Sequence, residues 1–164
     1  MKKLILMLML FMPLATFAQK FGHINAQEVM TSMPEFIKAR GEIEATAKQY
    51  ENDMKAMQDE LQRKADEYEK SKSTMNETKK KETETNLMQL QQKIQQAYQD
   101  NSQALQKKQQ ELMQPIVTKV RNAIDAVGKA GGYTFIFEDG VAVYTGTNVE
   151  DVTSKVQAEI SKMK

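Results

Sequence analysis

Few residues in this chain have the types and spacing that catalysis requires. The sequence contains one histidine, His23, and no cysteine, so a nucleophile with a histidine base finds little support and a thiolate metal site has no ligands. His23 alternates with Phe21 and Asn25 along an expected strand, which favours a structural role for it. The carboxylates are spread over helical stretches beside lysines, as on solvated helix faces. We therefore expect no enzyme activity, no cofactor and no metal site.

Residues suited to adaptable binding do occur in the middle of the chain. Methionine side chains are unbranched and polarisable, so they adapt to partners of many shapes. Met54 and Met57 lie on an apolar stripe with Tyr50, Tyr98 lies on a second stripe, and Met88 falls near them in the distal half of the expected arm. These residues are our candidates for binding a client polypeptide. The alternative is that the methionines only form contacts between two helices, and the sequence supports the two interpretations about equally.

The elements that position these residues follow from the stripes. Steps of three and four residues predict one helix over about residues 35–70 and a second over about residues 77–129. Paired from the centre outward, stripe positions have residue numbers that sum to 147 or 148, as an antiparallel hairpin with its turn near residues 72–76 requires. The pairs are Leu61 with Leu87, Met57 with Leu90, Met54 with Ile94, Tyr50 with Tyr98, Ala47 with Asn101, Ile43 with Leu105 and Phe36 with Leu112.

Prolines and glycines mark where the long helices begin, bend and end. Pro34 is tolerated in a first helical turn, and Ser32 before it is a candidate cap. Pro115 removes a backbone hydrogen bond within the second helix, and we place the joint between a helical arm and a body there. Gly131 and Gly132 are expected to end the helix, and this role explains them better than a phosphate-binding loop.

The body is expected to be small, β-rich and built from both ends of the chain. Residues 21–25 predict a first strand, and the β-prone runs 133–137 and 141–144 predict two more. Because Asp139-Gly140 is a favoured turn pair, these last two runs are predicted to form a β-hairpin.

An oligomerisation surface is predicted on this hairpin. Phe135 and Phe137 share one strand face by the two-residue period, and Val141 and Val143 belong to the same surface. We expect this face to be buried in an assembled body. A last amphipathic helix, capped by Asn148 or Asp151, presents an apolar face made of Val152, Val156 and Ile160.

The first 18 residues have the pattern of a cleaved signal peptide. A positive start precedes an apolar run over residues 4–14, and Thr16-Phe17-Ala18 supplies the small residues that a signal peptidase reads. The run is too short for a permanent membrane helix. Cleavage after Ala18 is expected to leave a soluble exported protein, with a body of residues 19–34 and 115–164 and an arm of residues 35–114.

The charge of the mature chain argues against nucleic acid as a partner. Without Lys2 and Lys3, the 23 basic residues become 21 against 22 acidic ones, a net charge near −1. The expected arm tip is locally basic, with Lys70, Lys72, Lys79, Lys80 and Lys81. It could attract acidic segments or lipid headgroups weakly, although a solvated loop explains these lysines about twice as well.

Taken in order, these segments resemble the Skp/OmpH-like family of periplasmic chaperones over almost the whole mature chain. The likeness includes the strand at residues 21–25, the run Met33-Pro34-Glu35-Phe36, the Gln/Lys/Glu-rich hairpin, residues 111–116 and the strand entry at residues 132–135. The resemblance implies a homotrimer shaped like a jellyfish, with three helical tentacles around a cavity. It also implies ATP-independent holding of unfolded outer-membrane proteins. The near-neutral charge departs from basic family members, so no lipopolysaccharide site is carried over.

The sequence thus predicts an α+β, mostly α fold, in which a small β body carries a long antiparallel α-helical coiled-coil hairpin arm. The leading functional hypothesis is a holdase chaperone of the outer-membrane assembly route. The alternative is a structural or adaptor coiled-coil protein that docks its hairpin on a fixed envelope partner. Such an adaptor needs a well-packed seam, whereas Ala47, Ala97 and Asn101 make this one thin, which favours the chaperone.

Overall fold

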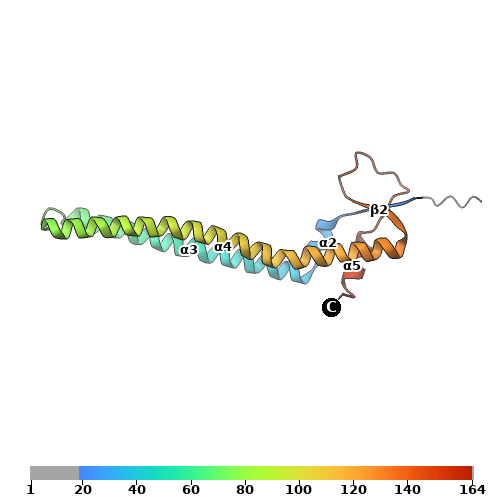
Figure 1. Cartoon of the computed structure of the whole chain (residues 1–164), viewed down its shortest axis with the longest axis horizontal. Helices are drawn as coiled ribbons and strands as arrows, with labels where there is room; N and C mark the ends of the chain where they lie inside the picture. The colour runs from blue at the N-terminus through green and yellow to red at the C-terminus, as the bar shows by residue number, and fades with distance from the viewer. Residues whose placement is uncertain (1–18, 164) are drawn as a thin grey trace, which may run out of the picture. The chain divides into compact units, whose positions relative to one another are not determined.

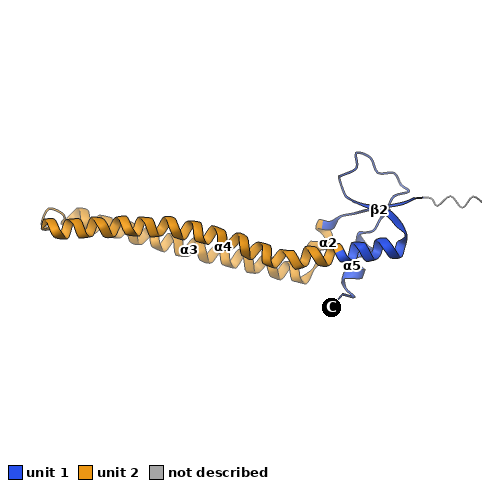
Figure 2. Cartoon of the chain, viewed as in Figure 1, with its two compact units in different colours: residues 1–26, 122–164 blue, residues 27–121 orange. Residues whose placement is uncertain are grey.

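The structure is a computed structural model that describes residues 19–163, a mostly helical α+β chain (Figure 1). The elements are β1 (Lys20–Ile24), α2 (Ala26–Ser32), α3 (Pro34–Ser71), α4 (Glu77–Gly131), β2 (Tyr133–Glu138), β3 (Glu150–Asp151) and α5 (Thr153–Ile160). The expected signal peptide lies outside the described residues. Two compact units divide the chain: unit 2 holds residues 27–121, and unit 1 holds the residues on either side (Figure 2). None of the described helices is long and apolar enough to cross a membrane.

Unit 2 is built around α3 and α4, which run side by side in opposite directions (Figure 1). The 38 residues of α3 reach about 57 Å. The predicted hairpin and its turn at residues 72–76 are confirmed, because α3 ends at Ser71 and α4 begins at Glu77. Most residues of both predicted stripes are half-buried, as expected for the seam between two helices.

One stripe residue was predicted wrongly. Tyr98 is 69% exposed, and the half-buried seam position is its neighbour Ala97. The helical period gives the reason: steps of three and four lead from Ile94 through Ala97 to Asn101, and one further residue turns a side chain about 100° away.

Another expectation, about the start of α3, also changes. The predicted Ser32 cap is wrong, because Met33 occupies the N-cap of α3 and the Ser32 hydroxyl donates a hydrogen bond to the Val29 carbonyl at 2.7 Å. α4 continues through Pro115 as one helix of 55 residues. Ile116 and Val120, directly after the proline, are buried, so packing holds the helix together where one backbone hydrogen bond is missing.

Unit 1 contains a three-stranded parallel sheet with the order β2-β1-β3. The predicted strand at residues 133–137 is confirmed as β2, but the β-hairpin is wrong. Gly140 turns with φ of +79°, and the chain after it forms a loop instead of returning along β2. In this loop Val143 is 108% exposed. β-Propensity reflects a fit to a half-buried pleated surface, and a single chain offers these residues no such surface.

The core of unit 1 joins the sheet to the end of α4 and to α5. Its most buried residues come from all three elements: Ile24, Ala123, Val127, Val152, Val156 and Ile160. The predicted apolar face of α5 is therefore confirmed. The predicted cap by Asn148 or Asp151 is wrong, because Val152 occupies the N-cap of α5. Asp151, one residue earlier, accepts a hydrogen bond from the Thr153 N–H at 2.9 Å. Gly22 is buried in β1, where a Cβ would meet the Tyr133 ring at 3.1 Å and Val152 at 3.2 Å.

Candidate functional site

A groove of about 740 Å³ runs along the middle of the helix pair in unit 2. Tyr50 and Met54 of α3 and Tyr98 of α4 line it, together with Asn101 and Leu105. The first three are sequence-predicted client-binding residues that the structure brings together. Tyr50 and Met54 are half-buried, and Tyr98 stands exposed beside them. Asn101, Ser102 and Gln58, which also line the groove, were not in the predicted set.

The other two predicted client-binding residues lie outside this groove. Met57 is half-buried on the seam of α3, and Met88 is 61% exposed on α4. The structure therefore separates the five candidates into a clustered group and two scattered methionines. The hydrophobic stripe could not predict which candidates line the groove. A stripe identifies the helix face that meets the seam, but it does not distinguish the two flanks of that seam.

The helix pair has no buried side chain over most of its length. Every residue from 40 to 115 is half-buried or exposed, including Leu61, Leu87 and Ile94 on the seam. Two helices contact along one line, so each seam side chain keeps a flank open to solvent. A large amount of adaptable apolar surface thus remains available along the arm.

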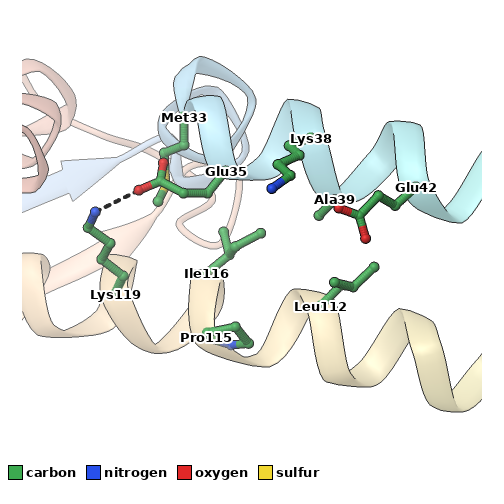
Figure 3. Close-up of a pocket in the computed structure, with 9 residues that line it drawn as sticks. All are labelled: Met33, Glu35, Lys38, Ala39, Glu42, Leu112, Pro115, Ile116 and Lys119. Carbon is green, nitrogen blue, oxygen red and sulfur yellow. Dashed lines mark hydrogen bonds and ion pairs between the residues drawn. The ribbon is translucent and has the colours of Figure 1, made fainter. Parts of the chain in front are cut away.

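Side chains become buried only near the base of the helix pair, where a second and smaller hollow of about 260 Å³ lies (Figure 3). Met33 and Ala39 line it from one side and Ile116 from the other. Beside it, Lys119 pairs with Glu35 across the two helices at 2.8 Å, and this contact lowers the pKa of Glu35 below its usual range. We interpret this region as the support of the arm, because its apolar residues Met33, Ala39 and Ile116 are already buried within the chain.

An exposed aromatic surface lies on the sheet of unit 1. Phe21 stacks on Phe135 and Phe137 with ring centroids 6.1 and 6.4 Å apart, and the two β2 rings are 5.8 Å apart. Phe135 is 55% and Phe137 40% exposed. The sequence placed these two on one face, but it missed Phe21, which the parallel register sets opposite Phe135. Val141 and Val143, the other predicted oligomerisation residues, lie exposed on the loop after β2.

The base of that loop is held by the single histidine. The Nδ1 atom of His23 lies 2.6 Å from a carboxylate oxygen of Asp139. The backbone N–H of the same Asp139 also donates a hydrogen bond to the Ile24 carbonyl at 2.8 Å. His23 therefore has the structural role that its place on the strand predicts, since it ties the start of the loop to β1.

A polar network fastens β3 to the rest of unit 1. The Glu150 carboxylate accepts hydrogen bonds from Lys155 and from the Tyr133 hydroxyl, and Lys20 lies 3.1 Å away. These contacts, with that of Lys155 the largest, lower the pKa of Glu150 to about 2. They also raise the pKa of both lysines. The Lys20 ammonium lies 4.1 Å from the centre of the Tyr133 ring. No sequence pattern predicted this network, because Lys20 and Tyr133 are distant from Glu150 along the chain.

The arm tip is less basic than its lysines suggest. Lys72 pairs with Glu69 at 2.6 Å, Lys79 with Glu82 at 2.9 Å and Lys80 with Glu77 at 2.8 Å. These local pairs reduce the positive charge that could attract a lipid headgroup.

A cross-helix hydrogen bond lies close to the tip. The Tyr68 hydroxyl donates to Glu84, which raises the pKa of Tyr68 to about 12. This contact joins α3 to α4 within one turn of helix from the end of α3. Within residues 19–163, no group of three His, Asp or Glu side chains is placed to hold a metal ion.

Comparisons with known proteins agree with this architecture. The model of a family described as outer membrane protein (OmpH-like) matches residues 20–160. The crystal structure of a candidate outer membrane chaperone (OmpH-like) from Caulobacter crescentus superposes with a TM-score of 0.76. The match covers 89% of this chain and 86% of that one, at 12% sequence identity, so it shows a shared fold. No curated protein matches the chain.

Proposed function

The chain belongs to the OmpH-like outer membrane protein family, and on this premise we propose that it is an ATP-independent periplasmic holdase. Its clients are unfolded outer-membrane proteins, which it keeps from aggregating on their way to the outer membrane. The family is one of chaperones and not of enzymes. A holdase needs no reactive side chain, only surface that can cover apolar segments of a client.

The observation that carries this proposal is the unburied seam of the arm. Unfolded barrel proteins present alternating apolar side chains, and a surface of half-buried Met, Leu, Ile and Tyr residues can cover them without fixed pockets. Each such contact contributes on the order of 0.5–1 kcal/mol, so many together hold a client firmly while each remains easy to break. Release can then follow from the folding of the client into the membrane. An adaptor that docks on one fixed partner has no use for so much open seam.

The proposal includes a homotrimer that assembles through unit 1. Three observations support it: the exposed aromatic surface of Phe21, Phe135 and Phe137, the outer edge of β2, and the exposed β-prone run at residues 141–144. Exposed strand edges and large aromatic patches are liabilities in a monomer and are usually covered by a partner. Neighbouring copies would cover all three features and bring three arms around one cavity.

Assembly can be tested by placing a charge on the aromatic surface. Phe135→Asp should convert trimers to monomers in analytical ultracentrifugation, because burying an unpaired carboxylate in the interface costs several kcal/mol, on the order of 3 or more. Val117→Asp, a charge on a helical position that is 47% exposed, serves as the matched control and should remain trimeric. A Phe135→Asp protein that stays trimeric would remove unit 1 as the assembly surface.

Holding can be tested by shortening the arm. Joining Tyr50 to Tyr98 with a short turn removes the outer part of the helix pair and leaves all of unit 1 in place. We expect this variant to stay trimeric but to lose most of its ability to suppress light scattering when a denatured barrel protein is diluted from urea. If the shortened protein suppresses aggregation as well as the full chain at equal molar ratio, the clients are held on unit 1 and not on the arm.

A further inference from the structure

The groove in the middle of the arm has a feature that helix pairing does not explain. Tyr98 points away from the seam and remains 69% exposed, although it is one of the largest side chains on the arm. Within residues 19–163, neither Tyr98 nor Tyr50 makes a hydrogen bond or a ring contact, although both line the same hollow. The hollow of 740 Å³ is lined by an aromatic ring that has no partner of its own. Its lining therefore has the composition of a ligand pocket.

Polar side chains make up part of the lining of this hollow. Asn101, whose side chain carries an amide, is half-buried and lines the groove. Ser102 and Gln58 add further polar atoms at the edge. These groups can donate to and accept from a peptide backbone, whose N–H and C=O groups need partners when an apolar side chain is buried.

The charges at the rim indicate which segments would fit. Glu51 is already paired with Lys48 at 2.8 Å, and this contact lowers the pKa of Glu51 below its usual range. Lys55 and Asp59, one helical turn apart, supply one charge of each sign. The rim therefore has no net charge to complement, so an uncharged segment matches it better than an acidic or a basic one.

The length of the groove favours an extended occupant. From Tyr50 to Asp59 the α3 side of the groove spans about 13 Å at 1.5 Å per residue. An extended chain covers that distance with about four residues, and two of its side chains then point toward the arm. Outer-membrane strands in the unfolded state are chains of this kind, with apolar side chains at every second position.

Resting on the holdase function above, we propose that this groove is an anchor site for an aromatic side chain of an uncharged, extended client segment. The client ring stacks on Tyr98 and lies between Tyr50 and Met54, and Asn101 bonds to the client backbone. The scattered methionines Met57 and Met88 are not part of this site. Binding here is driven by apolar contact and is insensitive to salt.

The test uses the full mature chain and two fluorescent peptides of about ten residues. One peptide alternates Phe with Ser, and the other has Lys in place of each Phe; affinity is measured by fluorescence polarisation at about 50 and 500 mM NaCl. We expect the Phe peptide to bind the more tightly and equally well at both salt concentrations. Tyr98→Ala should weaken it about tenfold, and Tyr98→Phe, which keeps the ring, should stay within about twofold. Ile37→Ala, which removes an exposed apolar side chain of α3 outside the groove, should also stay within about twofold.

Four results would each overturn the proposal. They are unchanged binding in both Tyr98→Ala and Tyr50→Ala, an equal loss in Ile37→Ala, equal affinity for the Lys peptide, and a marked loss of affinity at high salt. Light scattering of a denatured barrel protein is measured in parallel on the wild type. If the wild type suppresses aggregation while the peptide affinity does not depend on Tyr98, the anchor site is wrong and the holdase function stands. If peptide binding depends on Tyr98 but aggregation is not suppressed, the holdase function alone fails.

Discussion

The core of unit 1 and the seam of unit 2 use similar side chains and bury them to different degrees. Val152 and Val156 are fully buried in unit 1, whereas Ile94 and Leu105 on the seam remain half-buried. The difference lies in how many elements surround each residue. A sheet, the end of α4 and α5 enclose a side chain in unit 1, while a residue on the seam is enclosed by two helices only. The same amino-acid types therefore stabilise one unit and leave the other ready to bind.

The largest expected effect comes from placing a charge in each region. Val156→Asp should cost about 4 kcal/mol of unfolding free energy, because the carboxylate would be fully buried without a partner. Leu105→Asp on the half-buried seam should cost about 1 kcal/mol, because the charge can turn toward water. Urea unfolding followed by circular dichroism measures both.

Ser154→Asp is the control for this pair, since it adds the same charge to an exposed position in the first turn of α5. It should leave the midpoint of unfolding nearly unchanged. Equal losses in Val156→Asp and Leu105→Asp would mean that the seam is enclosed as fully as the core, and the comparison between the two units would fail.

Acid should act on unit 1 through Glu150. The folded-state pKa of about 2 lies below the ordinary value of 4.5, so the contribution of this carboxylate to stability is present above pH 4.5 and is lost as the pH falls toward 2. Glu150→Gln should lower the urea midpoint at pH 7 and should remove part of the stability loss between pH 4.5 and 2. The wild type and the variant must converge at low pH. A constant difference between them over the whole range would show that the effect is not one of charge.

The smallest expected effect concerns the register of the helix pair, which the stripe predicts and which stays a prediction. The contacts Tyr68–Glu84 and Glu35–Lys119 have residue numbers that sum to 152 and 154, which is between one and two helical turns above the predicted 148. Long polar side chains on a flank can reach that far. Cysteines at Ala47 and Asn101, or at Ile43 and Leu105, should therefore cross-link with little change in unfolding temperature.

The matched alternative is a pair of cysteines at Ala47 and Leu105, whose numbers sum to 152. Oxidation followed by electrophoresis compares the rates. Faster cross-linking of this alternative pair would shift the register by one turn and would move the client-facing flank with it.

The sequence by itself determined the parts of the fold that depend on local pattern. A stripe with three- and four-residue steps is enough to place both long helices, and glycines are enough to end α4. The apolar face of α5 followed in the same way from Val152, Val156 and Ile160. These features depend on residues a few positions apart, whose relation the helical period fixes.

The tertiary structure alone decided which segments pair and which side of a helix is open. The run at residues 141–144 is strongly β-prone, yet it forms no strand, because β-structure needs a neighbouring surface and a single chain supplies none. Glu150 and Asp151, for which the sequence predicted no strand, pair with β1 instead. Tyr98 lies on a flank and not in the seam, because one residue of helix turns a side chain through about 100°. The network around Glu150 joins residues from positions 20 to 155, a separation over which sequence pattern carries no information about contact.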